Sequence, residues 1–177
     1  MDDAPFLSGL ADAFVTLKGV SGKSTGATAQ PVVLEQKGCE YIPYVFALQT
    51  NQKLSVKNSD PVLHNVHSTP AVAGNEEKNI AQAPNQPDLT FSFSKPEMFL
   101  RFKCEVHPWM FSYACVTDHP WSAVTDKDGK YTLKNVPDGK YTMEVYHRKA
   151  APANAPVTKE VEVTGGNITQ DFTLEAK

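Results

Sequence analysis

The stretch Cys104–Met110 limits most narrowly what this chain can fold into, because it places a thiol, an imidazole and a thioether at Cys104, His107 and Met110. One short loop could present all three groups. With a second imidazole, they are the donors of mononuclear copper sites that use two His, one Cys and a weak axial Met. His64 lies about forty residues upstream and is the candidate for that imidazole. A lone Cys-x-x-His favours a buried structural cysteine beside a surface histidine, but this larger set favours a metal site.

The motif Cys-x-x-His-Pro-x-Met, together with His64-Asn65-Val66-His67 upstream, resembles the cupredoxin family. Within that family it is most similar to the short ligand loop of the amicyanin type, with Trp109 at a position that is Phe there. The resemblance covers about half of the chain, roughly residues 30–117. It implies a Greek-key β-sandwich that binds one copper ion, cycling between Cu(I) and Cu(II). The implied ligands are His64, Cys104, His107 and Met110.

Residues next to the implied ligands are candidates for supporting roles. In cupredoxins the residue at the position of Asn65 ties the two ligand segments together by hydrogen bonds, and such contacts fix ligand geometry; a turn-favouring Asn is the alternative. Pro108 and Trp109 could form an apolar rim around an exposed imidazole edge, or Trp109 could be a core residue. His67 lies three residues after His64, so on a strand it should point away from the metal.

Three cysteines are present, Cys39, Cys104 and Cys115, so at least one is unpaired. If Cys104 binds copper, Cys39 and Cys115 can form a disulfide in an oxidising compartment. The rival pairing of Cys39 with Cys104 would remove the metal ligand. The spacing of the three residues does not decide between these pairings, because that depends on distances in the fold.

The segment before and around the motif is predicted to be a β domain over residues 28–118. Alternating or β-rich stretches predict strands that enclose the Cys104–Met110 loop on both sides. A ligand loop between two adjacent strands is held at both ends. Residues 68–87 show no period and are expected to form a long irregular excursion. The expected strands are residues 32–35, 41–48, 52–57, 88–94, 99–103 and 111–117.

The pattern changes after residue 118. Residues 123–133 are expected to form a strand, an Asp-Gly turn and a second strand that includes 131–133, and further strands are expected at 157–163 and 168–174. Thr125–Leu133 and Val136–Tyr141 resemble the hairpin signature of the carboxypeptidase regulatory-like, or transthyretin-like, β-sandwich. That family begins with a strand that the segment after residue 118 lacks. Ala13–Gly19, far upstream, matches the pattern of this strand. We therefore expect residues 1–27 and 119–177 to form one domain into which the cupredoxin-like domain is inserted; the alternative is two domains in tandem. The whole chain is predicted to be all-β.

Composition narrows the function classes further. The net charge of −3 gives no indication of nucleic-acid binding, and no apolar run approaches the length of a membrane span. No nucleophile elbow, phosphate-binding Gly motif or carboxylate pair indicates an enzyme. The cupredoxin resemblance implies a periplasmic or extracytoplasmic protein, with a signal peptide removed before Met1.

The sequence therefore predicts a blue (type 1) copper protein that carries single electrons between redox partners, such as a c-type cytochrome or an oxidoreductase. Copper storage or delivery with the same ligands is the first alternative. The second is a structural module without metal, in which Cys104 is tied up in a disulfide. The domain after residue 118 is expected to be a docking or spacer module.

Overall fold

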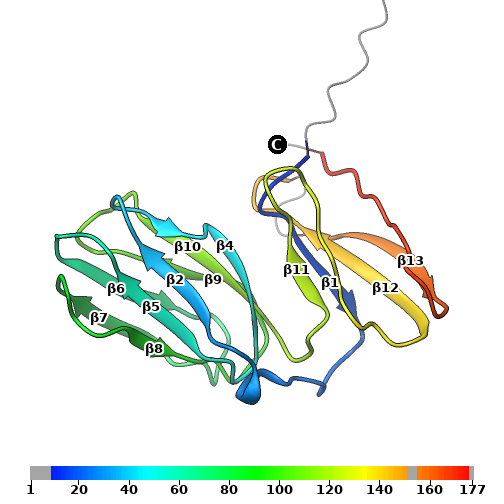
Figure 1. Cartoon of the computed structure of the whole chain (residues 1–177), viewed down its shortest axis with the longest axis horizontal. Helices are drawn as coiled ribbons and strands as arrows, with labels where there is room; N and C mark the ends of the chain where they lie inside the picture. Colours follow the sequence, from blue (N-terminus) through cyan, green and yellow to red (C-terminus); the bar gives the residue numbers. More distant parts are fainter. Residues whose placement is uncertain (1–8, 151–154, 176–177) are drawn as a thin grey trace, which may run out of the picture. The chain divides into compact units, whose positions relative to one another are not determined.

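The structure is a computed structural model that describes residues 9–150 and 155–175. The fold is all-β: the described residues form strands and a single three-residue 3-10 helix, η1 (Gly26–Thr28). None of them belongs to a helix long and apolar enough to cross a bilayer. The chain divides into two compact units, one of residues 20–120 and the other of residues 1–19 and 121–177 (Figure 1). Residues 1–8, 151–154 and 176–177 of the expected second domain lie outside the described part.

The 20–120 unit consists of two sheets. The four-stranded sheet has the order β3-β2-β5-β8, and the five-stranded sheet has the order β4-β10-β9-β6-β7. Most neighbours are antiparallel, but β2 pairs with β5 and β4 pairs with β10 in parallel. The strands are β2 (Val32–Gln36), β3 (Tyr41–Ile42), β4 (Val45–Gln49), β5 (Leu54–Asn58), β6 (His64–Thr69), β7 (Lys78–Gln82), β8 (Leu89–Phe91), β9 (Glu97–Lys103) and β10 (Phe111–Thr117).

The core of this unit joins the two sheets because successive strand residues face opposite sides. In β5, for example, Leu54 and Val56 are fully buried and the intervening Ser55 is not. Phe102 of β9 packs its ring against Phe91 of β8 in the opposite sheet, at a centroid distance of 5.8 Å. Cys104 and Met110 belong to the same buried cluster. The Cys104–Met110 segment is therefore anchored in the hydrophobic core.

The 20–120 unit reaches beyond the expected limits of 28 and 118. Backbone hydrogen bonds explain its N-terminal extension: Lys23 donates its N–H to the carbonyl of Asp118, and Gly22 donates to the Asp118 carboxylate. The predicted irregular excursion over 68–87 was wrong in part, because β7 lies within it. β7 has too few apolar residues to show a period, but it pairs with β6 through backbone hydrogen bonds, with Val66 opposite Ile80.

The second unit contains one four-stranded antiparallel sheet in the order β11-β1-β12-β13. The N-terminal strand β1 (Phe14–Lys18) lies inside this sheet, between β11 (Ser122–Val124) and β12 (Gly139–Tyr146); β13 (Val157–Val163) follows at the edge. Thr125, just after β11, adds two hydrogen bonds to the segment before β1: its N–H donates to the Ala13 carbonyl, and its hydroxyl donates to the Leu10 carbonyl. Segments from both ends of the chain thus build one sheet.

Two expected strands of this unit are absent from the described residues: 131–133 and 168–174 have no ladder partners. Both segments have the alternating sequence expected of strands, but they are held by side-chain contacts rather than by backbone ladders. Tyr131 donates its hydroxyl to the Gln170 carbonyl, and Lys159 donates to the Asp171 carbonyl. The described residues of this unit therefore form one ladder-paired sheet, and the transthyretin-like sandwich stays a prediction.

Candidate metal centre

The loop Cys104–Met110 joins two neighbouring antiparallel strands, β9 and β10, whose last pair before the loop is Lys103 and Phe111. Two backbone hydrogen bonds close the loop: the Cys104 N–H donates to the Met110 carbonyl at 3.0 Å, and the Met110 N–H donates to the His107 carbonyl at 2.9 Å. These bonds fix the chain at both ends of the motif. The loop can therefore present its side chains with little backbone freedom.

His64 comes from the adjacent strand. It is the first residue of β6, which pairs with β9 through His67 and Lys103. Burial alternates along β6, so His64 is fully buried whereas Asn65 and His67 lie on the other face. Strand alternation explains why only one of the two histidines in His64–His67 reaches the loop.

The structure brings two predicted ligands, His64 and Cys104, against a third, His107. The Nδ1 atoms of His64 and His107 are 3.1 Å apart, and Cys104 Sγ lies 3.6 Å from His107 Nδ1. Ligand atoms around one trigonal metal with bonds of ~2.0–2.3 Å would be roughly 3.5–3.7 Å apart. The observed separations are close to that, so the residues fit a metal ion. A thiolate with two imidazoles suits copper.

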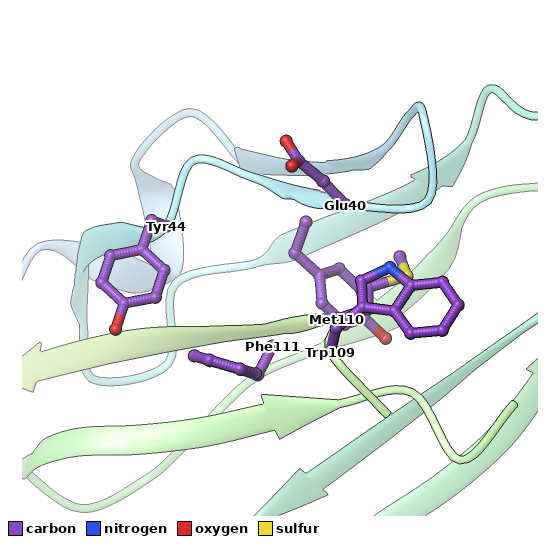
Figure 2. A pocket seen from close by; sticks show the side chains of 6 residues that line it. Glu40, Tyr44, Trp109, Met110 and Phe111 are labelled. Atoms are coloured by element: carbon purple, nitrogen blue, oxygen red, sulfur yellow. The ribbon is translucent and has the colours of Figure 1, made fainter. Parts of the chain in front are cut away.

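Met110, the fourth predicted ligand, is the last residue of the loop and is 1% exposed. It also lines a pocket of about 280 Å³ with Trp109 and four other residues. Figure 2 shows Trp109 and Met110 at one end of this pocket and Tyr44 at the other, with Glu40 at its edge. The thioether is therefore held in an apolar environment beside the donor loop.

Asp60 is a functional candidate that sequence reasoning missed. Its Oδ2 accepts a hydrogen bond from His64 Nε2 at 2.8 Å. This contact places the ring proton on Nε2 and leaves the Nδ1 lone pair directed toward His107, the arrangement in which a carboxylate orients a metal-binding imidazole. Burial raises the pKa of Asp60, but the N–H groups of Cys39 and Gly38 and the contact with His64 outweigh it and hold that pKa below its usual value.

Asn65 has contacts that match its predicted supporting role. Its side-chain oxygen accepts the N–H of Glu105 at 3.2 Å, and its own N–H points to Cys104 Sγ at 3.4 Å. Tyr41 adds a further tie that the sequence did not suggest, because its hydroxyl lies 2.6 Å from the Asn65 carbonyl and 3.3 Å from that of Lys103. Burial, then the nearby Cys104, raises the pKa of Tyr41, so it stays a hydrogen-bond donor. These contacts join the two ligand segments.

Trp109 is exposed rather than part of the core, with 63% of its surface accessible. Its ring meets the His107 imidazole edge to face at 5.3 Å, and its Nε1 donates to the Cys39 carbonyl at 3.1 Å. Pro108 beside it is also exposed, and His107 is partly buried. An imidazole edge flanked by apolar exposed side chains thus borders the centre.

The predicted disulfide between Cys39 and Cys115 is wrong, because no disulfide joins any two of the three cysteines, all of which lie in the described part of the chain. Cys115 is fully buried in the middle of β10, five residues beyond Met110, which is roughly 16 Å along a strand. Cys39 instead lies beside the loop, with its Sγ 4.0 Å from His107 Nε2. The rival Cys39–Cys104 disulfide is absent too; the two thiols lie near different nitrogens of the His107 ring.

His67 lies outside the ligand set. Its Nε2 contacts Glu77 at 2.6 Å and its Nδ1 contacts Glu105 at 2.5 Å. The hydrogen bond with Glu77 raises the pKa of His67, burial opposes this, and Glu105 adds to the increase. His67 therefore links β6 to Glu77, just before β7, and to Glu105 in the Cys104–Met110 loop.

No protein-family model and no curated protein matches the sequence closely. Solved structures that are similar include the copper-containing nitrite reductase from Thermus scotoductus SA-01, with 20% identity and a TM-score of 0.43 over 49% of this chain. Another is an amicyanin variant in the Cu(I) state, with 18% identity and a TM-score of 0.43 over 58% of this chain. This chain covers 22% of the nitrite reductase and 97% of the amicyanin.

Proposed function

We propose that the 20–120 unit is a cupredoxin-like copper domain that transfers single electrons. The observation that carries the proposal is that His107 Nδ1 lies 3.1 Å from His64 Nδ1 and 3.6 Å from Cys104 Sγ, on a loop that ends at the buried Met110. Copper bound by these donors supplies one-electron exchange between Cu(I) and Cu(II).

The residues around the donors suit this role because they limit movement. The Cys104–Met110 loop is closed by backbone bonds, His64 is oriented by Asp60, and Tyr41 ties the carbonyls of both ligand segments. A site held by packing and hydrogen bonds outside the ligand set keeps its geometry when the metal charge changes. Electron exchange then requires little reorganisation.

Access to the centre is through His107. Its imidazole edge is partly exposed, with Trp109 at 63% and Val106 at 49% exposure on either side. Such a surface suits transient contact with a redox protein, such as a c-type cytochrome or an oxidoreductase, outside the cytoplasm. The chain itself would perform no bond-making chemistry and would not be an enzyme.

We further propose that the other unit is a carboxypeptidase regulatory-like module that serves as a spacer or docking element. Support comes from its Thr125–Leu133 and Val136–Tyr141 motifs and from the position of β1 inside its sheet. The copper domain would then be an insertion in that module.

Optical titration of the full-length protein with Cu(II) tests the electron-transfer proposal. We expect an intense visible thiolate-to-copper band at one copper per chain, and its complete loss in Cys104→Ser, because a serine hydroxyl is too weakly acidic to replace the thiolate. Cys115→Ala, which removes a buried thiol from the middle of β10, should keep the band. A thiolate-type band that persists in Cys104→Ser would refute the assignment.

A further inference from the structure

Cys39 has no role in the ligand set described above, yet it lies against the centre. Its Sγ is 4.0 Å from His107 Nε2, whereas Cys104 Sγ is 3.6 Å from His107 Nδ1. The two thiols thus lie next to the two nitrogens of one imidazole ring, Cys39 at Nε2 and Cys104 at Nδ1. One ligand atom from each of Cys39, His64 and His107 also lies within 4.8 Å of the others, so these three residues form a ligand set of their own.

The turn that carries Cys39 is held in position. Lys37 and Glu40 exchange backbone hydrogen bonds across it, and Cys39 itself adopts a left-handed backbone conformation with φ 55°. The N–H groups of Gly38 and Cys39 both donate to the Asp60 carboxylate, at 2.7 and 2.9 Å. A non-glycine residue in this conformation costs free energy, which the surrounding contacts must offset.

Asp60 therefore connects Cys39 to the centre. The same carboxylate oxygen, Oδ2, accepts from the Cys39 N–H and from His64 Nε2. Trp109 adds a second connection by donating to the Cys39 carbonyl. The positions of the Cys39 thiol and of the two imidazoles are consequently fixed by shared contacts.

The two thiols differ in accessibility. Cys104 is 3% exposed and belongs to the hydrophobic core, whereas Cys39 is only partly buried on an exposed turn between Gly38 and Glu40. Copper in solution or on another protein's thiolates could reach Cys39 first. Soft thiolate ligands select Cu(I), and two imidazoles complete a three-coordinate set.

We propose that Cys39, with His64 and His107, forms an outer Cu(I) position through which copper enters and leaves the centre. This rests on the proposal that Cys104 and the same imidazoles hold copper. A donor of Cu(I)-thiolate type would lose its copper–sulfur bond as the Cys39 thiol releases its proton to water and binds the ion. Transfer to Cys104 then exchanges one copper–sulfur bond for another: the Cys104 thiol releases its proton as it binds the ion, the freed Cys39 thiolate takes up a proton, and the oxidation state does not change.

The test uses full-length protein under anaerobic, reducing conditions, with Cu(I) supplied as its coloured bathocuproine disulfonate complex. Cys104→Ser should still bind one Cu(I) per chain, and the Cys104→Ser/Cys39→Ser double variant should bind at least tenfold more weakly. Equal affinities of the single and double variants would overturn the proposal. Circular dichroism checks that both variants fold, and Cys115→Ala is the control for loss of a thiol outside the centre.

A rate measurement keeps the proposal testable if Cys104→Ser does not fold. Cys39→Ser should give the same Cu(II) thiolate band as the natural protein, because Cys104 is intact, but should take up Cu(I) from the chelator at least tenfold more slowly. Uptake at the unaltered rate would overturn the outer position. Absence of the Cu(II) band from the natural protein would instead refute the electron-transfer function, while Cys39-dependent Cu(I) binding would still support the outer position.

Discussion

The two units of the chain use similar strand patterns but reach different degrees of regularity. In the 20–120 unit two sheets enclose a core, and the donor loop is tied to it through Cys104 and Met110. In the other unit one sheet is regular, and the segments that follow β11 and β13 are irregular. The regular, densely packed strands are therefore those that hold the Cys104–Met110 loop, as a site with fixed side-chain geometry requires.

The units also differ in how they use the chain. The 20–120 unit is continuous, whereas the other unit requires β1 from the N-terminal side to join β11 and β12. Phe14 and Val15 of β1 are almost completely buried in it. The continuous unit should therefore tolerate separation, and the discontinuous unit should not.

Separating the units is the largest perturbation. A fragment of residues 20–120 should fold and bind copper, because His64 and the Cys104–Met110 loop lie inside it. A fragment of residues 121–177 should be unfolded or aggregated, since it loses the strand between β11 and β12. Circular dichroism and size-exclusion chromatography would measure both.

The matched control joins residues 1–19 to residues 121–177 through a short Gly/Ser linker. The joined chain regains β1 and should give a soluble β domain without copper affinity. A monomeric, well-folded 121–177 fragment would show that β1 is dispensable and would favour two units in tandem.

Asp60→Asn should weaken copper binding by about 10–100-fold, the usual effect of losing a group that orients a metal ligand. With its oxygen at the Oδ2 position, the asparagine amide could still accept from His64 and Cys39, but its NH₂ group at the Oδ1 position cannot accept the N–H of Gly38. Competition titration with a chelator measures the change. Asp88→Asn is the control, because the Asp88 carboxylate is exposed and accepts the hydroxyl of Ser55 rather than any group at the centre. Unchanged affinity in Asp60→Asn would assign Asp60 to fold stability alone.

Met110→Leu should retain copper but raise the reduction potential, because removal of a weak axial donor leaves Cu(II) less stabilised than Cu(I). Leucine is similar in volume, so the buried site should tolerate it. Voltammetry measures the potential, with Met98→Leu on the exposed side of β9 as the control. If potential and spectrum both match those of the natural protein, Met110 is not a ligand.

Local patterns of the sequence predicted most strands of the 20–120 unit. Alternation predicted β5 and β8, and β9 and β10 were expected on the two sides of the Cys104–Met110 loop. β6, which carries His64, was not among the expected strands. β7 was missed because a mostly polar edge strand has no clear period. The strands expected at 131–133 and 168–174 were wrong because alternation alone does not supply a ladder partner.

Contacts between distant segments were harder to predict. The ligand types and their spacing were visible in the sequence, but the return of the Asp60 carboxylate onto His64 depends on how the turn folds. The position of Cys39 depends on a turn contributed by the other sheet. Counting cysteines therefore suggested a disulfide where the fold places a thiol against an imidazole.

The smallest expected effect contrasts one histidine from each unit. Hydrogen bonding with Glu77 raises the pKa of His67, and Glu105 adds to the increase. Burial and the positive charge of Lys103 oppose it but are outweighed. Burial lowers the pKa of His147, outweighing the favourable Asp12 carboxylate and Ala11 carbonyl, and Lys149 lowers it further. The two histidines should therefore give stability contributions with opposite pH dependence.

For His67 the folded pKa lies above the unfolded value of about 6.5, so its stabilising contribution is complete below that pH and is lost as pH rises through the folded pKa. For His147 the folded pKa lies below the unfolded value, so its stabilising contribution is complete above about pH 6.5 and is lost as pH falls through the folded pKa.

His67→Gln should thus destabilise its unit more at about pH 5.5 than at pH 8, and His147→Gln should destabilise its unit more at about pH 8 than at pH 5.5. Amide hydrogen exchange in β6 and in β12 reads each unit separately, with expected changes below about tenfold because both sites are near the surface. Parallel pH dependence of the two variants would contradict the opposite directions of the two shifts.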